Sequence, residues 1–497
     1  MTHLCVSLTG STPAELSDII RELPPSATAV ELRIDHLHSP LQSSTEALKA
    51  ILNATDRTVI ATNRPARAGG KFQGDEKKRL NTLREAAETG ADYIDVEMDS
   101  SARLGRIPGN TGRIVSCHDF QKTPEKLFSI YRDLKEAGAD VAKIAVRSRT
   151  INDTGAIFNL MERCTTTDLI AIGMGEKGIC TRVLAPKFDT FMTFASAKHD
   201  AAAAPGQVPC KQMDELYHFS SINPATRIYG VVANPVAHSM SPAIHNAAFT
   251  RTNLNAVYLP FKVDNVESFF EVFEHRDLRG LSVTIPHKQT MLSLMDEVDE
   301  LSRTVGALNT VDIRNGRRLG SNTDAAAALQ ALQQAADEAE IQLEQSHILI
   351  VGAGGAGRTL AHVLADKSRL LSIANRTVER AETLAGETGG SAYGLDQLNS
   401  LDPDVLINTT PVGMHPDVDR IPVPPDILRP GMVVFDAIYN PIQTRLMREA
   451  EEAGCVIASG FDWFVSQAAA QFQTWTDRDA PRELMANVVR DELSGQK

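Results

Sequence analysis

Several features that define other classes of protein are missing from this sequence of 497 residues. No run approaches about 18 apolar residues, so we expect no membrane-spanning segment. The opening residues, MTHLCVSLTG, lack a basic region followed by a long apolar stretch, so we expect no signal peptide and a cytoplasmic protein. A basic surplus is also absent, because the formal net charge is -13. That charge argues against nucleic acid or an anionic membrane as a main partner and leaves room for small anionic substrates.

The cysteines offer no metal site or disulfide framework. None of the six forms a CxxC pair or has the spacing of metal ligands, so we expect reduced thiols. What is present is ordinary for a globular chain, with 42% hydrophobic and 23% charged residues. The length points to about three domains, and the oligomeric state is left open.

The first half of the chain alternates short runs rich in Val, Ile and Ala with stretches of helical periodicity. Strands that alternate with helices indicate parallel pairing, and eight such units favour a closed (β/α)8 barrel. The predicted strands are LCVSL (4–8), AVELRID (29–35), TVIATN (58–63), YIDVEM (93–98), RIVSCHD (113–119), VAKIAV (141–146), LIAIGM (169–174) and FMTFAS (191–196).

Reactive side chains gather within these strands and at their carboxyl ends, where barrel enzymes carry their sites. Lys143 lies inside VAKIAV, where an amine is unfavourable unless it is paired or functional. It is either a lysine that reaches the rim or a desolvated amine with a lowered pKa, ready to form a Schiff base with a ketone. His118 is either a structural histidine beside Asp119 or an acid–base group, and its closeness to the strand of Lys143 favours the second interpretation.

Four motifs make residues 1 to about 218 resemble type I 3-dehydroquinate dehydratase: ELRID (31–35), CHDF (117–120), AKIAV (142–146) and APGQ (204–207). The resemblance implies that Lys143 forms an imine with the substrate ketone. It also implies that His118 takes a proton from the adjacent carbon and helps the hydroxyl to leave. A guanidinium fork suits a carboxylate, and that role falls to Arg182. The implied substrate contacts are Glu31, Arg33, Arg64, Arg182 and Gln207.

Two positions depart from that family. Ala68, in RPARAGG, stands where the family has a glutamate that orients the histidine. Ala203, in AAAAPGQ, stands where the family has a serine just before the lid glycine. We therefore expect a slower dehydratase, or one that depends on another carboxylate, with Asp35 and Glu97 as the candidates.

A polar stretch that contains prolines, residues 205–230, predicts a domain boundary near residues 218–226. The next segment, VVANPVAHSMSPAIHNAAF, predicts a strand, a turn and a helix. Helix capping explains its serine–proline pair, but it explains less well the full set of polar residues, which are Asn234, His238, Ser239, Ser241, His245 and Asn246.

Further polar groups follow the next predicted strands. GLSVTIPHK (280–288) places Thr284 and Lys288 at the exit of a strand, and GALNTV (306–311) and GSNTDAAA (320–327) add Asn309 and Asp324. Asn and Asp also suit turns, and a lysine in a loop is usually solvated. If they meet, a lysine and an aspartate can pass a proton to and from a hydroxyl during hydride transfer.

Residues 347–360, HILIVGAGGAGRTL, contain G-x-G-x-x-G between a predicted strand and a predicted helix. A plain tight turn is the alternative, but this context favours a pyrophosphate at the helix N-terminus. The following strand ends in NRT, without the acidic residue that binds a ribose hydroxyl. Two arginines there favour NADP over NAD, although Glu379 lies between them. The predicted cofactor contacts are Gly352, Ala353, Gly354, Gly355, Ala356, Gly357, Asn375, Arg376, Thr377, Arg380 and Gly460.

The motifs NPVAHSMSP, SVTIPHK, GSNTD, GAGGAG and NRT occur in this order, and through them residues 226–497 resemble shikimate dehydrogenase. The resemblance implies that Lys288 and Asp324 form the catalytic pair. Ser241 and Thr284 favour shikimate over quinate. Trp463 stands where Met is common, which we expect to alter packing near the nicotinamide. The implied substrate contacts are Ser239, Ser241, Thr284, Asn309, Tyr439 and Gln467.

These expectations define three domains: a barrel (1–220), a substrate domain (226–325, completed by 465–497) and a Rossmann NADP-binding domain (326–464). The barrel is expected to dehydrate 3-dehydroquinate, and the other two domains to reduce the product to shikimate with NADPH, without a metal. One alternative is an inert barrel that serves as a scaffold or partner module, which Ala68 and Ala203 support and the retained Lys143 opposes. Another is a quinate oxidoreductase that uses NAD.

Overall fold

The computed structural model describes residues 2–38, 40–107, 109–164, 168–198, 204–237 and 239–495, with side chains for all of these except 40–43 and 495. Ala203 and His238, both singled out in the sequence, lie outside the described residues. The chain divides into two compact units. The first is Met1–Tyr229 with Asn255–Leu278, and the second is Gly230–Leu254 with Arg279–Lys497.

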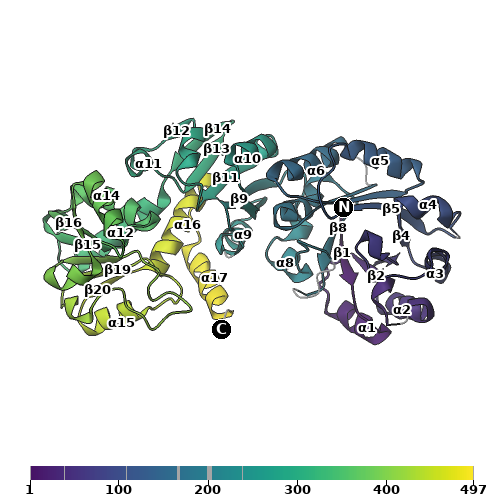
Figure 1. Ribbon diagram of the computed structural model, residues 1–497, viewed down its shortest axis with the longest axis horizontal. Coiled ribbons are helices and arrows are strands. Elements are labelled where there is room, and N and C mark those ends of the chain that lie inside the picture. The colour runs from purple at the N-terminus through teal and green to yellow at the C-terminus, as the bar shows by residue number, and fades with distance from the viewer. Residues whose placement is uncertain are drawn as a thin grey trace. The chain divides into compact units, whose positions relative to one another are not determined.

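Eight parallel strands form a nearly closed barrel in the first unit, in the order β7-β6-β5-β4-β3-β2-β1-β8 (Figure 1). At the seam, the Phe191 amide donates a hydrogen bond to the Leu169 carbonyl at 2.9 Å. The barrel predicted from the sequence is confirmed, with small shifts at strand ends. The strands are β1 (His3–Leu8), β2 (Ala29–Arg33), β3 (Thr58–Thr62), β4 (Tyr93–Glu97), β5 (Gly112–Asp119), β6 (Val141–Arg147), β7 (Leu169–Met174) and β8 (Met192–Ser196).

Local sequence sets the ends of the barrel helices. The Thr12 side chain caps the first helix, and Thr150 and Asp153 form a capping box on the sixth. The third helix ends at Gly90, whose φ of 114° suits glycine. The helices are α1 (Pro13–Glu22), α2 (Pro40–Ala54), α3 (Glu76–Thr89), α4 (Met98–Leu104), α5 (Leu127–Glu136), α6 (Ile151–Arg163), α7 (Ile179–Val183) and α8 (Cys210–Glu215).

The interior of the barrel changes character along its axis. At the amino ends of the strands, side chains such as Cys5, Ile60 and Met192 form an apolar cluster. Two residues further along the strands, the inward positions become polar: Ser7 pairs in register with Glu31, and Ser116 with Lys143. Because side chains alternate across a strand, the inward residues at the amino ends of the strands form a packed apolar core. Those nearer the carboxyl ends are polar and reactive.

The first unit also includes β10 (Ala256–Lys262) and α10 (Val266–Phe273). The ring of Phe273 meets that of Phe158 on α6 edge-on, with centroids 5.6 Å apart, and Arg276 forms an ion pair with Glu162 at 2.7 Å. The α6 face of the barrel is therefore covered by residues that follow it in sequence by more than a hundred positions.

A six-stranded sheet with the order β10-β9-β11-β13-β14-β12 follows the barrel. Its β11–β13 and β13–β14 pairs are antiparallel. Besides β10, its strands are β9 (Arg227–Ala233), β11 (Leu278–Val283), β12 (Glu297–Val298), β13 (Thr310–Arg314) and β14 (Arg317–Ser321), and the helices of this region include α9 (Ser241–Arg251) and α11 (Glu300–Val305).

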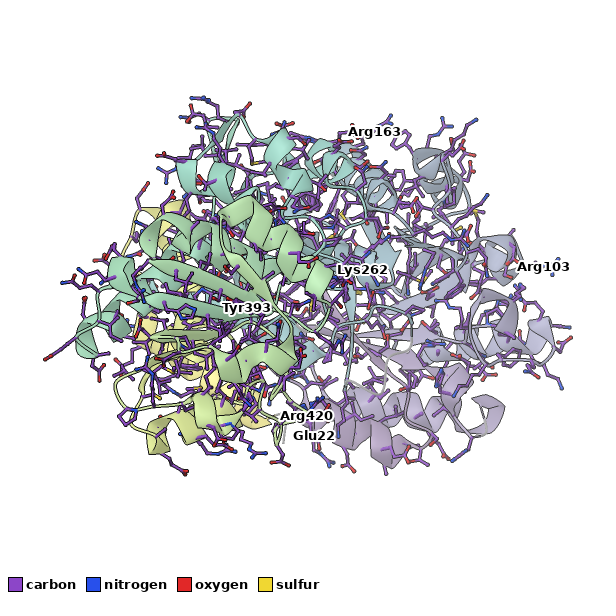
Figure 2. All side chains as sticks on the ribbon, turned by 60° about the vertical axis from the view of Figure 1, so that its left-hand side comes forward. Glu22, Arg103, Arg163, Lys262, Tyr393 and Arg420 are labelled. Atoms are coloured by element: carbon purple, nitrogen blue, oxygen red, sulfur yellow. The ribbon has the colours of Figure 1, made fainter. Side chains whose placement is uncertain are left out.

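The last sheet is parallel, in the order β17-β16-β15-β18-β19-β20. This order is that of a doubly wound Rossmann fold, which places a ligand where the strand order reverses, between β15 and β18. Tyr393 ends the edge strand β17 (Figure 2). The strands are β15 (His347–Val351), β16 (Leu370–Ala374), β17 (Ser391–Tyr393), β18 (Val405–Asn408), β19 (Val433–Asp436) and β20 (Val456–Ser459).

Two long helices connect this Rossmann sheet with the preceding one. The chain enters through α12 (Thr323–Glu338) and leaves through α16 (Gly460–Thr476), and the two helices pack against each other. The last helix, α17 (Arg482–Gly495), packs against α9. The remaining Rossmann helices are α13 (Gly355–Leu364), α14 (Val378–Thr388) and α15 (Arg445–Glu452). Among the described residues, no helix is long and apolar enough to cross a membrane.

Candidate active sites

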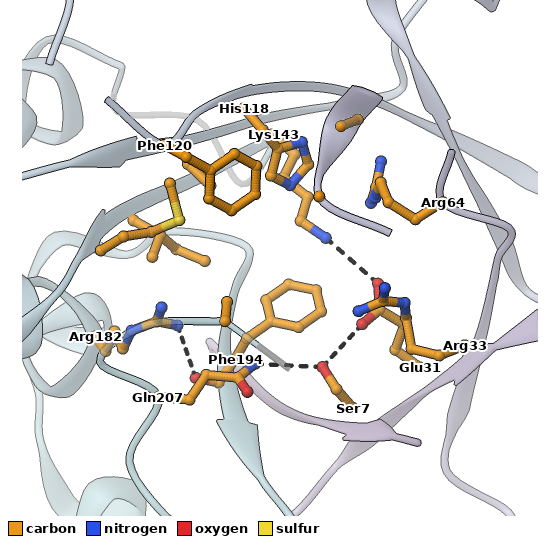
Figure 3. Close-up of a pocket in the computed structure, with 16 residues that line it drawn as sticks. Ser7, Glu31, Arg33, Arg64, His118, Phe120, Lys143, Arg182, Phe194 and Gln207 are labelled. Atoms are coloured by element: carbon orange, nitrogen blue, oxygen red, sulfur yellow. Dashed lines mark hydrogen bonds and ion pairs between the residues drawn. The ribbon is translucent and has the colours of Figure 1, made fainter. Parts of the chain in front are cut away.

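A small cavity of about 50 Å³ lies at the polar end of the barrel (Figure 3). It has room for only a few water molecules. Its wall contains all seven residues that the sequence predicted for the first site, together with Ala68: Glu31, Arg33, Arg64, His118, Lys143, Arg182 and Gln207. Six elements far apart in the sequence thus converge on one point.

Lys143 is 5% exposed and does not reach the rim. Its Nζ lies 2.8 Å from Oδ2 of Asp95 and 3.5 Å from Oε1 of Glu31, the second of which is drawn in Figure 3. The same Nζ lies 4.0 Å above the ring of Phe194. These partners stabilise a positive charge at Nζ, and such a charge persists in the iminium that the amine forms with a ketone.

Asp95 is the centre of a buried charge network beneath the cavity. It accepts hydrogen bonds from Arg64 at 2.7 Å and from the Ser116 hydroxyl at 2.7 Å, besides that of Lys143. Burial alone would raise the pKa of Asp95, but the charges of Arg64 and Lys143 outweigh it and hold the pKa below its usual range. Asp95 is therefore a fixed anion that orients two cations toward the cavity.

Arg182 is the exception among the buried charges. It is 1% exposed, and it donates a hydrogen bond to the Phe194 carbonyl at 3.1 Å (Figure 3). Within the described residues no carboxylate pairs with it and its Nε has no hydrogen-bond partner. Burial lowers the pKa of Arg182 to about 10. A buried cation without an anion is unfavourable, so this position is suited to a carboxylate from a ligand.

His118 lies at the end of β5 with its ring stacked 6.0 Å from that of Phe120. Burial, together with the charges of Arg64 and Lys143, holds the pKa of His118 well below 6.5. The imidazole is thus neutral near pH 7 and able to accept a proton. Among the described residues, no group hydrogen-bonds to its Nδ1.

Neither carboxylate proposed to replace the missing glutamate lies on His118. Asp35 receives two hydrogen bonds from Arg33, at 3.0 and 2.8 Å. Glu97 pairs with Arg64 at 2.7 Å and with Arg79 at 2.7 Å. Both carboxylates hold arginines in place instead, and Asp95 acts on the histidine only through its charge.

The sequence analysis missed Asp95, Ser7 and Ser116. Ser7 links Glu31, at 2.8 Å, to Gln207, at 3.4 Å (Figure 3). The argument that singled out Lys143 also applies to Asp95, since both are charged residues in the middle of a barrel strand. Applied to YIDVEM, it would have found Asp95.

A second and larger cavity, of about 310 Å³, lies in the second unit beside β9 and β11. Its wall contains Lys288 and Asp324 and all six predicted substrate contacts: Ser239, Ser241, Thr284, Asn309, Tyr439 and Gln467. Unlike the lysine of the barrel, the Lys288 side chain is 32% exposed.

The side chains of Lys288 and Asp324 are in contact, which proton transfer between them requires. The Nζ of Lys288 lies 2.6 Å from Oδ2 of Asp324. Asp324 is in the first turn of α12, which begins at the cap residue Asn322. An anion is favourable at a helix N-terminus, so the helix helps to fix the carboxylate beside the lysine.

Amides form the floor of this cavity. The Asn309 side chain bonds with Thr323, which is 2.9 Å from its Nδ2. Gln471 donates to the Asn309 carbonyl at 3.2 Å and accepts from the Ser282 hydroxyl at 2.8 Å. Gln471 and Ser282 line the cavity and were not predicted. For Gln471, the sequence did contain a signal: it lies four residues after Gln467, and this spacing places both amides on one face of α16.

One wall of the cavity is aromatic. The rings of Tyr439 and Phe464 stack with centroids 4.4 Å apart and planes inclined by 11°. Burial raises the pKa of the Tyr439 hydroxyl, so this hydroxyl stays protonated and can donate a hydrogen bond to a ligand. The stacked pair fixes its direction.

The glycine-rich turn after β15 has the geometry of a phosphate-binding loop. Gly352 has a φ of 112°, which favours glycine, and a Cβ at Gly357 would lie 2.0 Å from the Gly352 carbonyl. No atom lies within 4 Å of a Cβ built at Gly354 or Gly355. The turn is therefore tight on its inner side and open on the side where α13 begins, as a bound pyrophosphate requires.

The groups expected to distinguish NADP from NAD lie on the adjacent strand end. Asn375 accepts a hydrogen bond from the Ala353 amide at 3.2 Å. Arg376 and Arg380 are exposed, and within the described chain neither forms an ion pair. Two free guanidinium groups at this strand end fit a 2′-phosphate.

Gly460 is closely packed at the point where α16 begins. A Cβ there would lie 2.4 Å from the Ile438 carbonyl and 2.5 Å from that of Asp436. Its small size is required for α16 to start close to β19, and it does not line the cavity of Lys288. A cofactor contact at Gly460 stays a prediction.

The first pocket is suited to imine chemistry on a carboxylated ketone, and the second to oxidoreduction of a polyhydroxylated ring with a dinucleotide. These features define a two-site enzyme that joins a Schiff-base lyase to a dinucleotide-dependent oxidoreductase. Family comparisons agree in each segment. Residues 4–224 match the type I 3-dehydroquinase family, 231–311 the shikimate dehydrogenase substrate-binding domain, 333–411 the shikimate/quinate 5-dehydrogenase family, and 460–490 the shikimate 5′-dehydrogenase C-terminal domain.

The chain belongs to the family of bifunctional 3-dehydroquinate dehydratase/shikimate dehydrogenases. It is 40% identical over 486 residues to the chloroplastic bifunctional enzyme of Arabidopsis thaliana, covering 93% of this chain and 80% of that one. It is also 38% identical to the NADP-dependent shikimate dehydrogenase of Pyrococcus furiosus, over 56% of this chain and 100% of that one. A crystal structure of a shikimate dehydrogenase with NADP+ is 37% identical, with a TM-score of 0.50, and covers 55% of this chain and 97% of that chain.

Proposed function

We propose that the two pockets catalyse consecutive reactions. The barrel dehydrates 3-dehydroquinate to 3-dehydroshikimate, and the second unit reduces that ketone to shikimate with NADPH. The observation that carries the first assignment is the combination of a buried lysine on Asp95, a neutral histidine and an unpaired buried arginine in one cavity. Each of the three groups supplies a function that this dehydration requires.

In the dehydration, Arg182 binds the substrate carboxylate. The Lys143 amine attacks the ketone carbon and water leaves, giving an iminium that Asp95 and Glu31 stabilise. The iminium withdraws electrons from the adjacent carbon, and neutral His118 removes a proton from it. The carbon–hydroxyl bond then breaks as His118 returns that proton to the departing oxygen. Hydrolysis of the iminium releases the enone and restores the amine.

In the reduction, Ser239, Ser241, Thr284, Asn309 and Gln467 hold the ring through its hydroxyl and carboxylate groups. The glycine-rich turn would hold the pyrophosphate of NADPH, and Arg376 and Arg380 its 2′-phosphate. When bound there, the nucleotide would supply the hydride. Lys288 donates a proton to the ketone oxygen, and Asp324, 2.6 Å away, keeps the amine oriented. The reverse reaction passes the proton in the opposite direction.

Two alternatives make different predictions. An inert barrel would have no need for the network of Lys143, Asp95 and Arg64, which remains fully paired. A quinate oxidoreductase with NAD would leave Arg376 and Arg380 without a ligand. Activity measurements with shikimate or quinate, each with NADP or NAD, distinguish that alternative from the proposed function. The oligomeric state stays open.

The cytoplasmic location is also a proposal, since the Arabidopsis relative is named as chloroplastic. Fractionation of source cells, with each of the two activities followed across the fractions, tests it.

The test of the dehydratase uses the purified chain and 3-dehydroquinate without nucleotide. We expect the ultraviolet absorbance of a conjugated enone to rise, and borohydride to trap an adduct that peptide mapping places on Lys143. The matched control is Lys177→Ala, which removes a lysine outside both cavities. Absence of enone and adduct, in protein that still oxidises shikimate with NADP, would reduce the barrel to a scaffold.

A further inference from the structure

The chain has two tryptophans, and one of them contacts the reductase pair directly. Trp463, in the first turns of α16, donates a hydrogen bond from Nε1 to the backbone carbonyl of Asp324 at 2.8 Å. The carboxylate of the same Asp324 accepts from Lys288 at 2.6 Å. One aspartate therefore connects the lysine of the site with the indole of a helix 139 positions further along the chain.

This hydrogen bond joins the starts of two helices. Asp324 opens α12 and Trp463 opens α16, and these two helices are the covalent connections of the Rossmann sheet to the preceding sheet. On its other side, the indole meets the ring of Phe435 edge-on, with centroids 5.7 Å apart. Phe435 lies on β19, in the core of the Rossmann sheet. The indole thus bridges that core and the backbone of Asp324.

The neighbouring residue extends the bridge. Phe464 stacks on Tyr439, which lines the same cavity as Lys288 and Asp324. Trp463 and Phe464 therefore position two walls of the cavity from a single helical turn. A carbonyl in the first turn of a helix accepts one bond within the helix, and a second donor on it restrains that turn against fraying. A methionine at position 463 would fill the space but has no N–H group to donate.

We propose that Trp463 is a positioning residue, which fixes Asp324 and through it Lys288 at the place set by the nucleotide-binding sheet. This inference rests on the proposed reductase function. Trp463 acts through Asp324 and takes no part in the transfer itself. Its contribution is to keep the lysine in line for proton transfer when the Rossmann sheet carries the cofactor.

The chain offers a matched control. Trp475 lies on the same helix, and its Nε1 also donates to a backbone carbonyl, that of Val311, at 2.9 Å. It lines neither cavity. Trp475→Phe therefore removes the same kind of bond from the same helix without touching the reductase pair.

We would measure shikimate oxidation with NADP for Trp463→Phe, Trp463→Met and Trp475→Phe. Both changes at position 463 are expected to lower kcat about tenfold, the loss of one hydrogen bond in the transition state. The dissociation constant for NADPH is expected to stay within about twofold. The solvent deuterium isotope effect on kcat is expected to rise, because proton transfer becomes more limiting. Trp475→Phe should change neither kcat nor the isotope effect, whatever it does to Tm.

Fluorescence supplies a second readout. In Trp475→Phe the emission comes from Trp463 alone, and we expect it to shift when shikimate enters the cavity. Unchanged kcat and isotope effect in both position-463 variants would overturn the inference, as would equal losses in Trp475→Phe. A wild-type protein that fails to oxidise shikimate would instead overturn the proposed function, so the two failures are distinguishable.

Discussion

The two pockets use a lysine in opposite ways. Lys143 is 5% exposed in a cavity of about 50 Å³, held between two carboxylates and an aromatic ring. The Lys288 side chain is 32% exposed in a cavity of about 310 Å³, paired with one aspartate. In the proposed dehydration, the first lysine becomes covalently bound to the substrate. In the proposed reduction, the second only exchanges a proton, and its cavity must admit a ring and a nicotinamide together.

The difference extends to the surrounding charges. The barrel fixes its charges in a buried network, and among the described residues that line its cavity only Arg182 is left to attract an anion. The second site relies on neutral amides, hydroxyls and a stacked pair of rings.

The largest changes in the two reaction rates are expected when each lysine is removed separately. Lys143→Ala is expected to lower dehydration by a factor on the order of 10⁴ or more, because no other amine reaches the ketone. It should leave shikimate oxidation intact. Lys288→Ala is expected to do the reverse, by about 10²- to 10⁴-fold. Both rates are measured on each variant, and loss of both activities from one change would contradict two separate sites.

The unpaired arginine gives the next largest effect. Arg182→Met should lower kcat/KM for dehydration by about 10²- to 10³-fold, because the substrate carboxylate loses its partner. The free energy of unfolding should rise, since an unpaired buried charge is removed.

Its matched control is the paired arginine. Arg64→Met removes one of the two cationic partners of Asp95 and one of the two of Glu97, so the free energy of unfolding should fall by about 3–5 kcal/mol. Urea titration of both variants checks the opposite signs. A fall of stability in Arg182→Met would show that its cation has a partner.

A smaller effect is expected at the nucleotide site. Arg376→Ala should raise KM for NADP about tenfold and leave KM for NAD unchanged, because only NADP carries the 2′-phosphate. Steady-state kinetics with both nucleotides measure this. Arg369→Ala, on the far end of β16, is the control. Equal changes with both nucleotides would place Arg376 away from the 2′-phosphate.

The smallest effect concerns Ala68. Since the pKa of His118 is held well below 6.5, the base stays neutral as pH falls through 6.5. Dehydration should decline only at lower pH, when the imidazole takes a proton. Ala68→Glu adds an anion that favours the imidazolium, so the acid limb should move to higher pH and the rate near pH 8 should change a few-fold. A wild-type acid limb above pH 6.5 would contradict the assigned environment of His118.

Much of the fold could be predicted because it depends on local patterns. The eight barrel strands were found from short runs of β-branched residues, and the Rossmann turn from glycines between a strand and a helix. In the structure, Glu31, Arg33 and Lys143 line the same cavity. The resemblance to two families supplied the roles of these groups, which stay proposals.

The pairing of the buried charges could not be predicted, because it depends on contacts between residues far apart in the sequence. Asp95 meets Lys143 across 48 positions and Arg64 across 31. Asp35 and Glu97 were considered for His118, but in the structure their nearest arginines hold them. Which carboxylate pairs with which cation is decided by side-chain directions in a closed barrel, and no periodicity in the sequence encodes these directions.

By itself, the sequence determined the order and type of the elements and the chemical groups at strand ends, because these follow from neighbouring residues. Only the tertiary structure decided that no described carboxylate pairs with Arg182, that Gln471 supports Asn309 and that Trp463 holds Asp324. Each of these is a matter of burial and pairing between distant segments. Such contacts exist only once the chain has closed the barrel and joined the two sheets through α12 and α16.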